Sequence, residues 1–175
     1  IHEEGGLFGA KNLDYIKLKA KSAFVLDSSK EPGEIIIQGP AQNKINAKFI
    51  GKEAHAGVAP ENGISAIQML SEAISNMKLL RIDEVTTANI GIISGGHATN
   101  IVPKEAIFKA EARSLNDYKL REQTDHMIKC CEDAANKYGG QVEVEVINSY
   151  GAFKVDEEDE VVKKVKVACS NIGLN

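Results

Sequence analysis

Residues 44–52 read Lys-Ile-Asn-Ala-Lys-Phe-Ile-Gly-Lys, and this stretch decides how the middle of the chain folds. Ile45, Ala47 and Phe49 occupy alternate positions, which indicates a strand with one buried face. The segment that follows, residues 56–63, contains two glycines and a proline and is therefore predicted to be a loop.

A helix is expected after this loop, over about residues 64–80. Its inward stripe has helical spacing and consists of Ile67, Leu70, Ile74 and Met77. A second helix is predicted to begin after the N-cap residue Asn116 and to end at Gly139-Gly140. Its inward face is expected to carry Leu120, Thr124, Met127, Cys131, Ala134 and Tyr138.

Three more strands follow from the alternation of side chains. They are a strand through Ala88, Ile90 and Ile92 that stops at Gly95-Gly96, a strand over residues 106–113, and a strand through Val142, Val144 and Val146. The element order over residues 44–150 is therefore βαββαβ. Because each strand has one apolar and one polar face, the predicted fold class is α+β. The expected fold is a four-stranded antiparallel sheet with two helices on one face and water on the other.

The flanks of this unit are predicted to belong to a different, discontinuous domain. The expected elements there are helices over residues 7–13 and 156–171 and strands over residues 23–26 and 34–38. Gly39-Pro40 has the composition of a junction. We therefore expect one complete domain over residues 43–150 and two incomplete pieces of another, residues 1–42 and 151–175.

The composition excludes several classes of protein. The 175 residues include 21 Lys and Arg against 25 Asp and Glu, a formal net charge of −4, so we expect no nucleic-acid partner. No apolar run approaches the ~20 residues that cross a bilayer, so we expect no membrane partner. The three cysteines have no Cys-x-x-Cys spacing. This argues against a disulfide framework or a thiolate zinc site and favours a reducing, cytoplasmic location.

Three carboxylates in the N-terminal flank are candidates for chemistry. Glu3 and Glu4 are adjacent, and like charges this close repel unless a cation such as a metal lies near them. One glutamate could then bind the metal while the other activates water, although a solvated acidic loop also explains the pair. Asp27 ends an apolar stretch, where open α/β sheets place functional groups, but a turn-capping role fits it too.

Two segments of the middle domain carry candidate hydrogen-bond donors. His55 lies in a loop, where a histidine can act as a proton donor or stabilise a transition state, and a surface histidine is the alternative. Asn100 lies in the connection over residues 95–103, and Arg113 lies on the polar face of the next strand. Such donors, presented together, suit a carboxylate. A hairpin turn explains the same connection.

The order and spacing of these groups are far more specific than any one of them. The chain contains Glu3-Glu4-Gly5-Gly6-x-x-Gly9-Ala10, Asp27, Gly51-Lys52-x-Ala54-His55-Ala56-Gly57-x-x-Pro60-x-x-Gly63, Gly95-Gly96-x-x-x-Asn100-x-Val102-Pro103 and Arg113-Ser114. This run resembles the peptidase T, carboxypeptidase G and aminoacylase superfamily of two-zinc hydrolases, and within it the peptidase T-like branch. The resemblance covers essentially the whole chain.

The resemblance implies an activity and a zinc site. Glu3 matches the general base that takes a proton from the water bridging two zinc ions, and Glu4 and Asp27 match one ligand of each ion. The implied enzyme is a zinc-dependent metallopeptidase that hydrolyses short peptides from the amino end, like a tripeptidase.

The resemblance also implies a homodimer. His55 matches a histidine that enters the active site of the partner subunit and stabilises the oxyanion. Asn100 and Arg113 match polar residues that hold the substrate, and residues 44–150 match the lid or dimerisation domain. The flanks, residues 1–42 and 151–175, match incomplete pieces of the α/β zinc-peptidase catalytic domain.

The chain departs from this family at the metal site. The family also has an upstream His-x-Asp motif, an upstream bridging aspartate and a late histidine, and none of these is present here. Because Glu4 and Asp27 alone cannot complete a dinuclear cage, we expect an internal fragment that neither binds two zinc ions tightly nor hydrolyses peptides. Two alternatives stay open: an N-acyl amino acid hydrolase of the same superfamily, and a non-catalytic module that dimerises or binds a small molecule.

Overall fold

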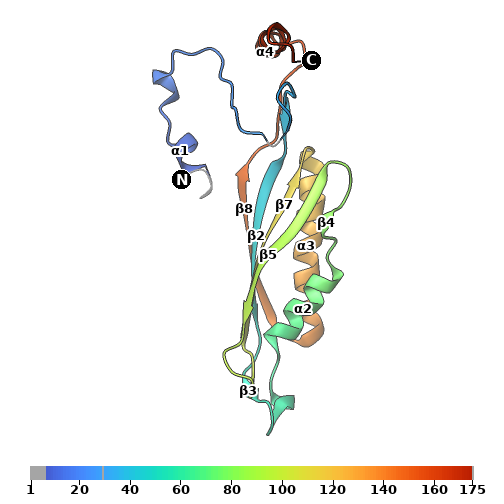
Figure 1. Ribbon diagram of the computed structural model, residues 1–175. Coiled ribbons are helices and arrows are strands. Elements are labelled where there is room, and N and C mark those ends of the chain that lie inside the picture. The colour runs from blue at the N-terminus through green and yellow to red at the C-terminus, as the bar shows by residue number, and fades with distance from the viewer. Residues whose placement is uncertain (1–6, 29, 175) are drawn as a thin grey trace. The chain divides into compact units, whose positions relative to one another are not determined.

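The computed structural model describes residues 7–28 and 30–174 of the chain. The chain divides into two compact units (Figure 1). The larger unit is Gly39–Phe153, and the smaller one combines Ile1–Gln38 with Lys154–Asn175. The larger unit contains the βαββαβ domain that the sequence predicts.

Four long antiparallel strands form the sheet of the larger unit. They are β2 (Ala41–Ile50), β5 (Thr86–Gly95), β7 (Glu105–Ser114) and β8 (Gln141–Tyr150). A two-residue strand, β4 (Leu80–Arg81), pairs with the start of β5, so the order is β4-β5-β7-β2-β8. The four predicted strands are confirmed, and β4 is an addition that no alternating pattern indicates.

Two helices, α2 (Ala66–Asn76) and α3 (Asp117–Tyr138), lie on one face of this sheet, as Figure 1 shows. The predicted cap of α3 is confirmed, because the side-chain oxygen of Asn116 accepts a hydrogen bond from the amide of Lys119 at 3.1 Å. Gly139 ends α3 with a φ of +73°, a left-handed conformation that glycine adopts at little cost. Local capping signals therefore set both ends of the long helix.

The hydrophobic core lies between the sheet and the two helices. Ile45 and Phe49 of β2 are fully buried, as their alternating positions predict. The ring of Phe49 packs against that of Phe108 in β7, with centroids 6.2 Å apart. Met69 of α2 and Met127 of α3 belong to the same buried cluster. Both helices are therefore held to the sheet by one core.

The predicted inward stripe of α2 is confirmed at three of its four positions: Leu70 and Met77 are buried, and Ile74 packs against the core. Ile67 departs from it and is 41% exposed, whereas Met69 and Ala73 are buried. Spacings of three and four residues fit two neighbouring faces of one helix, and packing against the sheet selects between them. The helix also ends before residue 80, because the backbone is already extended at Met77.

Strand β5 contains a β-bulge that changes which side chains point inward. The register with β7 shifts between Ile90 and Ile92, so Gly91 is the extra residue. Ile92 therefore lies opposite Lys109 on the open face of the sheet and is 55% exposed. Simple alternation with Ala88 and Ile90 would place Ile92 on the buried face, and that expectation is wrong.

The flanking elements are shorter than predicted. The helices expected in residues 7–13 and 156–171 are present as α1 (Phe8–Lys11) and α4 (Glu160–Asn171). The 3₁₀ turn η1 (Tyr15–Lys17) follows α1. A two-stranded sheet pairs β1 (Gln38–Gly39) with β9 (Phe153–Lys154).

The strand predicted over residues 23–26 is wrong. Val25 and Leu26 are 86% and 99% exposed, and among the described residues no strand pairs with this segment. Of the strand predicted over residues 34–38, only Gln38 is in a strand. Apolar sequence alone does not make a strand, because backbone N–H and C=O groups need a neighbouring strand to pair with.

Within residues 7–28 and 30–174, no helix has both the length and the apolar character needed to cross a membrane.

Candidate functional site

Two short strands at one end of the larger unit bring His55 next to Asn100. β3 (Ala54–His55) pairs antiparallel with β6 (Ile101–Val102), with His55 opposite Ile101. The amide of Ala56 then donates a hydrogen bond to the carbonyl oxygen of Asn100 at 2.9 Å. Two predicted site residues from separate loops are thus joined in one structure, which we call the β3–β6 ribbon.

The chain that follows His55 folds back onto this residue. The amides of Val58 and Ala59 donate to the carbonyl oxygen of His55 at 3.3 and 3.1 Å. The amide of Gly57 donates to Nδ1 of the His55 ring at 3.1 Å, and the 3₁₀ turn η2 (Pro60–Asn62) comes next. Because His55 is exposed, its ring is held by this turn rather than by burial.

Gly63 lets the loop close against the β3–β6 ribbon. A Cβ atom at this position would lie 2.9 Å from Cγ1 of Val102 and 3.0 Å from Cβ of Ala54. Beyond it, Lys52 and Ile64 exchange two backbone hydrogen bonds of 2.9 Å. The loop is therefore closed at its base, and a larger residue at position 63 would push it off the ribbon.

Arg113, the other predicted substrate-binding residue, is held by a carboxylate on its own strand. Its Nε and Nη2 atoms donate to the two oxygens of Glu111 at 2.9 and 3.2 Å. This interaction raises the pKa of Arg113, so the guanidinium stays charged. Gln42 of β2 lies opposite Arg113, and its Nε2 donates to Glu111 at 2.6 Å. Gln42 is buried, so the pair is anchored to the body of the sheet.

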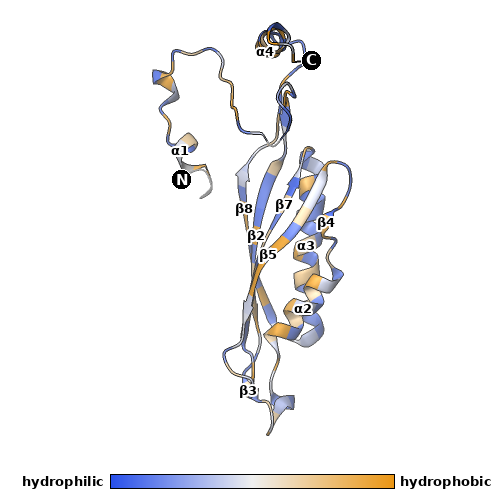
Figure 2. Ribbon diagram, in the orientation of Figure 1, coloured by the Kyte–Doolittle hydropathy of each residue, from blue (hydrophilic) through white to orange (hydrophobic). Residues whose placement is uncertain are grey.

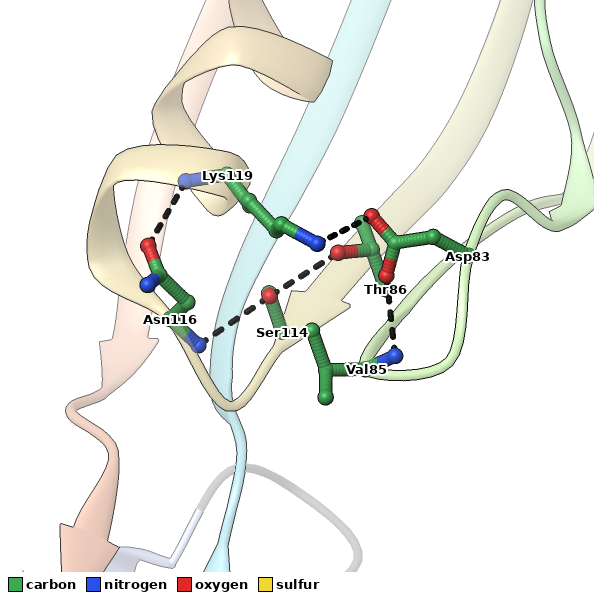
Figure 3. Close-up of polar contacts among 6 residues, drawn as sticks. All are labelled: Asp83, Val85, Thr86, Ser114, Asn116 and Lys119. Carbon is green, nitrogen blue, oxygen red and sulfur yellow. Dashed lines mark hydrogen bonds and ion pairs between the residues drawn. The ribbon is translucent and has the colours of Figure 1, made fainter.

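A polar network on the helix side fixes the same end of β7 (Figure 3). The buried hydroxyl groups of Thr86 and Ser114 lie 3.0 Å apart. Ser114 Oγ also accepts a hydrogen bond from the amide of Asn116 at 3.1 Å. The residue next to Arg113 is therefore tied both to β5 and to the start of α3.

Asp83 supports the turn between β4 and β5 in this network. Its two carboxylate oxygens accept from the Val85 amide at 2.8 Å and from Nζ of Lys119 at 2.9 Å (Figure 3). The hydrogen bond from Lys119, followed by that from Val85, lowers the pKa of Asp83 to about 2. The network therefore depends on an ionised Asp83.

Within one chain, Arg113 lies far from His55 and Asn100. The β3–β6 ribbon is at the end of the sheet where β7 begins, whereas Arg113 is near the end of β7 that leads into α3 (Figure 1). Eight steps along the strand, each of about 3.3 Å, separate Glu105 from Arg113, which is roughly 26 Å. The expectation that Asn100 and Arg113 present their donors together is therefore wrong for a single chain.

Of the three predicted metal-site residues, only Asp27 lies in the described part of the chain. Asp27 is exposed, and Glu3 and Glu4 lie outside the described residues. Among residues 7–28 and 30–174, no group of three or more His, Cys, Asp or Glu side chains is placed to hold a metal ion. The donor set described here does not fit a zinc centre by itself.

The cysteines have the properties of packing residues. Cys130 and Cys131 are buried in α3, and Cys169 lies in α4. Burial raises the pKa of Cys131 to about 12 and also raises that of Cys130. Thiols of this kind are poor nucleophiles and poor metal ligands at neutral pH.

The open face of the sheet contains a shallow groove of about 300 Å³. Its charged and polar lining residues include Asn46, Lys48, Lys109, Glu143 and Glu145. Asn46 donates to Glu145 at 2.9 Å, so part of this polar surface is already paired. The predicted site residues within the described part of the chain, Asp27, His55, Asn100 and Arg113, do not line the groove.

Sequence patterns alone do not assign a role to Glu111, Gln42 or Gly57. A strand places residues two positions apart on one face, so alternation could have paired Glu111 with Arg113. No local signal could have found Gln42, because it meets Glu111 only through the pairing of β2 with β7.

The chain is similar to known proteins along almost its whole length. The family model for the peptidase dimerisation domain (M20_dimer) matches residues 38–139. The Bacillus subtilis protein YqjE is 49% identical over 173 residues, which are 99% of this chain and 47% of that protein. The chain thus spans about half the length of this relative.

Two solved structures are similar along nearly the full chain. Aminopeptidase PepT from Bacillus cereus has a TM-score of 0.87 at 47% identity, covering 99% of this chain and 46% of that one. A tripeptidase from Staphylococcus aureus has a TM-score of 0.94 at 44% identity, covering 100% of this chain and 47% of that one. The resemblance to peptidase T-like hydrolases is confirmed, and the chain belongs to the M20 peptidase dimerisation-domain family.

Proposed function

We propose that this chain is part of a tripeptidase-like aminopeptidase that works as a homodimer. On this proposal residues 43–150 are the lid and dimerisation domain, and residues 1–42 and 151–175 are pieces of the catalytic domain. The similarity to a tripeptidase and to an aminopeptidase supports the activity. The observation that carries the proposal is the β3–β6 ribbon, which presents an exposed His55 beside Asn100 at the end of a dimerisation domain.

The distance within one chain supports an active site shared between two chains. An extended tripeptide is about 10 Å long, so it cannot span the roughly 26 Å between the two ends of β7. In a two-fold dimer, His55 and Asn100 of one chain can meet a substrate whose carboxylate is held by Arg113 of the other. His55 then donates to the oxyanion, and the charged fork of Arg113 binds the carboxylate.

In this proposal, the two chains dimerise through the outer edge of β5. β4 pairs only with Thr87 and Ala88, so in the described residues the rest of that edge has no strand beside it. Ile92 and Ile93 are more than half exposed there, and Figure 2 shows the apolar stretch along β5. A second β5 placed against this edge would extend the sheet across the two-fold axis and cover the isoleucines.

Zinc belongs to the proposal as the cofactor of the longer enzyme. Glu4 and Asp27 would supply one ligand to each of two ions, with Glu3 as the general base. The other ligands would come from outside the 175 residues. We also propose a cytoplasmic location, since the cysteines are free thiols among the described residues.

A longer enzyme that contains this chain provides the test of the activity. We expect the wild-type enzyme to hydrolyse tripeptides, and we expect the His55→Ala and Arg113→Ala variants each to lose this activity. Mixing the two variants should restore part of the activity, because mixed dimers contain one site with both residues intact. Failure of the mixture to recover would contradict the shared site. Cleavage of N-acyl amino acids instead would favour the alternative hydrolase, and no cleavage of either class would favour the non-catalytic module.

The 175-residue chain itself provides the second test. We expect light scattering to show dimers at high concentration, and calorimetric titration with zinc to show no tight binding. A chain that stays monomeric contradicts the dimer, and two tight zinc sites contradict the idea of an incomplete metal centre.

A further inference from the structure

We propose that the Gly57 amide is a positioning group, which holds neutral His55 with its ring proton on Nε2. The exposed ring then offers one N–H donor of defined position. The identity of its acceptor, the substrate oxyanion, rests on the proposed function, but the tautomer rests on geometry alone.

The tautomer follows from one hydrogen bond. The Gly57 amide lies 3.1 Å from Nδ1 of His55 in donating geometry. A backbone N–H can only donate, so Nδ1 must be the acceptor. A neutral imidazole has one acceptor nitrogen and one N–H, which places the proton on Nε2.

The surrounding turn keeps this hydrogen bond in place. The next two amides, those of Val58 and Ala59, both donate to the carbonyl oxygen of His55. Three successive N–H groups are therefore directed at one residue. The amide of Ala56 ties the start of the turn to the carbonyl oxygen of Asn100. The His55 ring is thus oriented by the backbone of a loop that is itself fixed to the β3–β6 ribbon.

The N–H of Gly57 matters here, not its lack of a side chain. A Cβ atom at this position would lie 3.6 Å from Cε1 and 3.8 Å from Nδ1 of His55, which are ordinary contact distances. Alanine therefore fits and keeps the donor, whereas proline lacks the N–H. These two substitutions separate the hydrogen bond from the shape of the residue.

The same chain contains a histidine held in the opposite way. The amide of Lys78 donates to Nε2 of His126 at 3.1 Å, so the proton of neutral His126 is on Nδ1. The backbone of Lys78 is itself fixed, because Nε2 of Gln123 donates a hydrogen bond to the Lys78 carbonyl oxygen at 2.8 Å. His97 is exposed in the loop before β6 and provides a reference ring. One spectrum can therefore compare three histidines.

A fixed tautomer suits a donor to a developing oxyanion. The Nε2–H group donates without the ring first taking up a proton, and its direction is set before substrate arrives. A ring that exchanged between tautomers would present an acceptor to the oxyanion for part of the time. The Gly57 amide removes that unproductive state.

The test is a long-range ¹H–¹⁵N NMR correlation of the histidine rings in the full, ¹⁵N-labelled 175-residue chain. The signals that disappear in the His55→Gln variant identify the His55 ring. The pH is kept well above the ordinary imidazole pKa of about 6.5. We expect His55 to show an unprotonated Nδ1 to a greater extent than His97, and His126 to show the reverse pattern. A His55 ring with the same tautomer mixture as His97, or with the proton on Nδ1, overturns the proposal.

Two variants complete the test. Gly57→Pro should shift the His55 resonances to the mixture seen for His97, while Gly57→Ala should keep the wild-type pattern. An unchanged His126 pattern reports that the domain is still folded. A His55 tautomer unaffected by Gly57→Pro overturns the proposal. Loss of peptidase activity in the longer enzyme, by contrast, bears on the proposed function and leaves the tautomer as measured.

Discussion

Gln42 and Glu111 lie on neighbouring strands, 69 positions apart in the sequence, and are joined by a hydrogen bond of 2.6 Å from Nε2 to a carboxylate oxygen. Glu111 uses the same carboxylate to hold Arg113. A buried amide, a half-exposed carboxylate and a guanidinium thus form one chain of contacts from the sheet to its open face.

Removing this carboxylate should destabilise the domain. Glu111→Ala leaves the buried Nε2 of Gln42 without its acceptor, which costs about 1–3 kcal/mol. Urea unfolding of Glu111→Ala, Gln42→Ala and the double variant measures the effect. We expect the double variant to lose less stability than the sum of the single variants, because the two side chains interact directly. Additive losses would mean that the two residues act independently.

Acid should selectively weaken the contact between Asp83 and Lys119. The pKa of Asp83 falls from 3.8 to about 2 on folding, so its contribution to stability is present above about pH 4 and is lost as the pH falls towards 2. We expect Asp83→Asn to melt at a lower temperature than the wild type at pH 7 and the difference to vanish near pH 2. Asp125→Asn, at an exposed position in α3, is the control. A pH-independent difference would contradict this role.

Truncating the aromatic pair in the core should have the largest effect on stability. Phe108 is fully buried and packs against Phe49, so Phe108→Ala should cost about 3–5 kcal/mol through lost burial and a cavity. Lys109→Ala, at the next position on the exposed face, is the matched control. Equal losses for the two variants, measured by urea unfolding, would show that Phe108 is not part of a packed core.

A charge on the β5 edge should weaken the proposed dimer. Ile93→Lys would place an ammonium group where two edges meet, and we expect the dimer Kd to rise at least tenfold, about 1.4 kcal/mol. Val146→Lys puts the same charge near the opposite edge, on β8, and should leave the dimer intact. Light scattering over a concentration series measures both. The reverse result would place the interface on β8.

Much of this fold could be predicted because its signals are local. The alternation around Phe49, the N-cap at Asn116 and the stop at Gly139 each depend on residues within a few positions, and all three are present in the structure. The predictions that failed depend on which distant strand, if any, pairs with the segment. Ile92 turns outward because of a bulge against β7, and residues 23–26 form no strand because none pairs with them among the described residues.

The candidate site divides in the same way. Motif spacing singled out His55, Asn100 and Arg113 as functional residues, and alternation placed Arg113 on the polar face of its strand. Only the tertiary structure joined His55 to Asn100 in one ribbon, placed Gln42 behind Glu111, and put Arg113 at the far end of the sheet. Periodicity and capping act over a few residues, whereas these relationships depend on strand pairing between distant segments, and no local pattern encodes them.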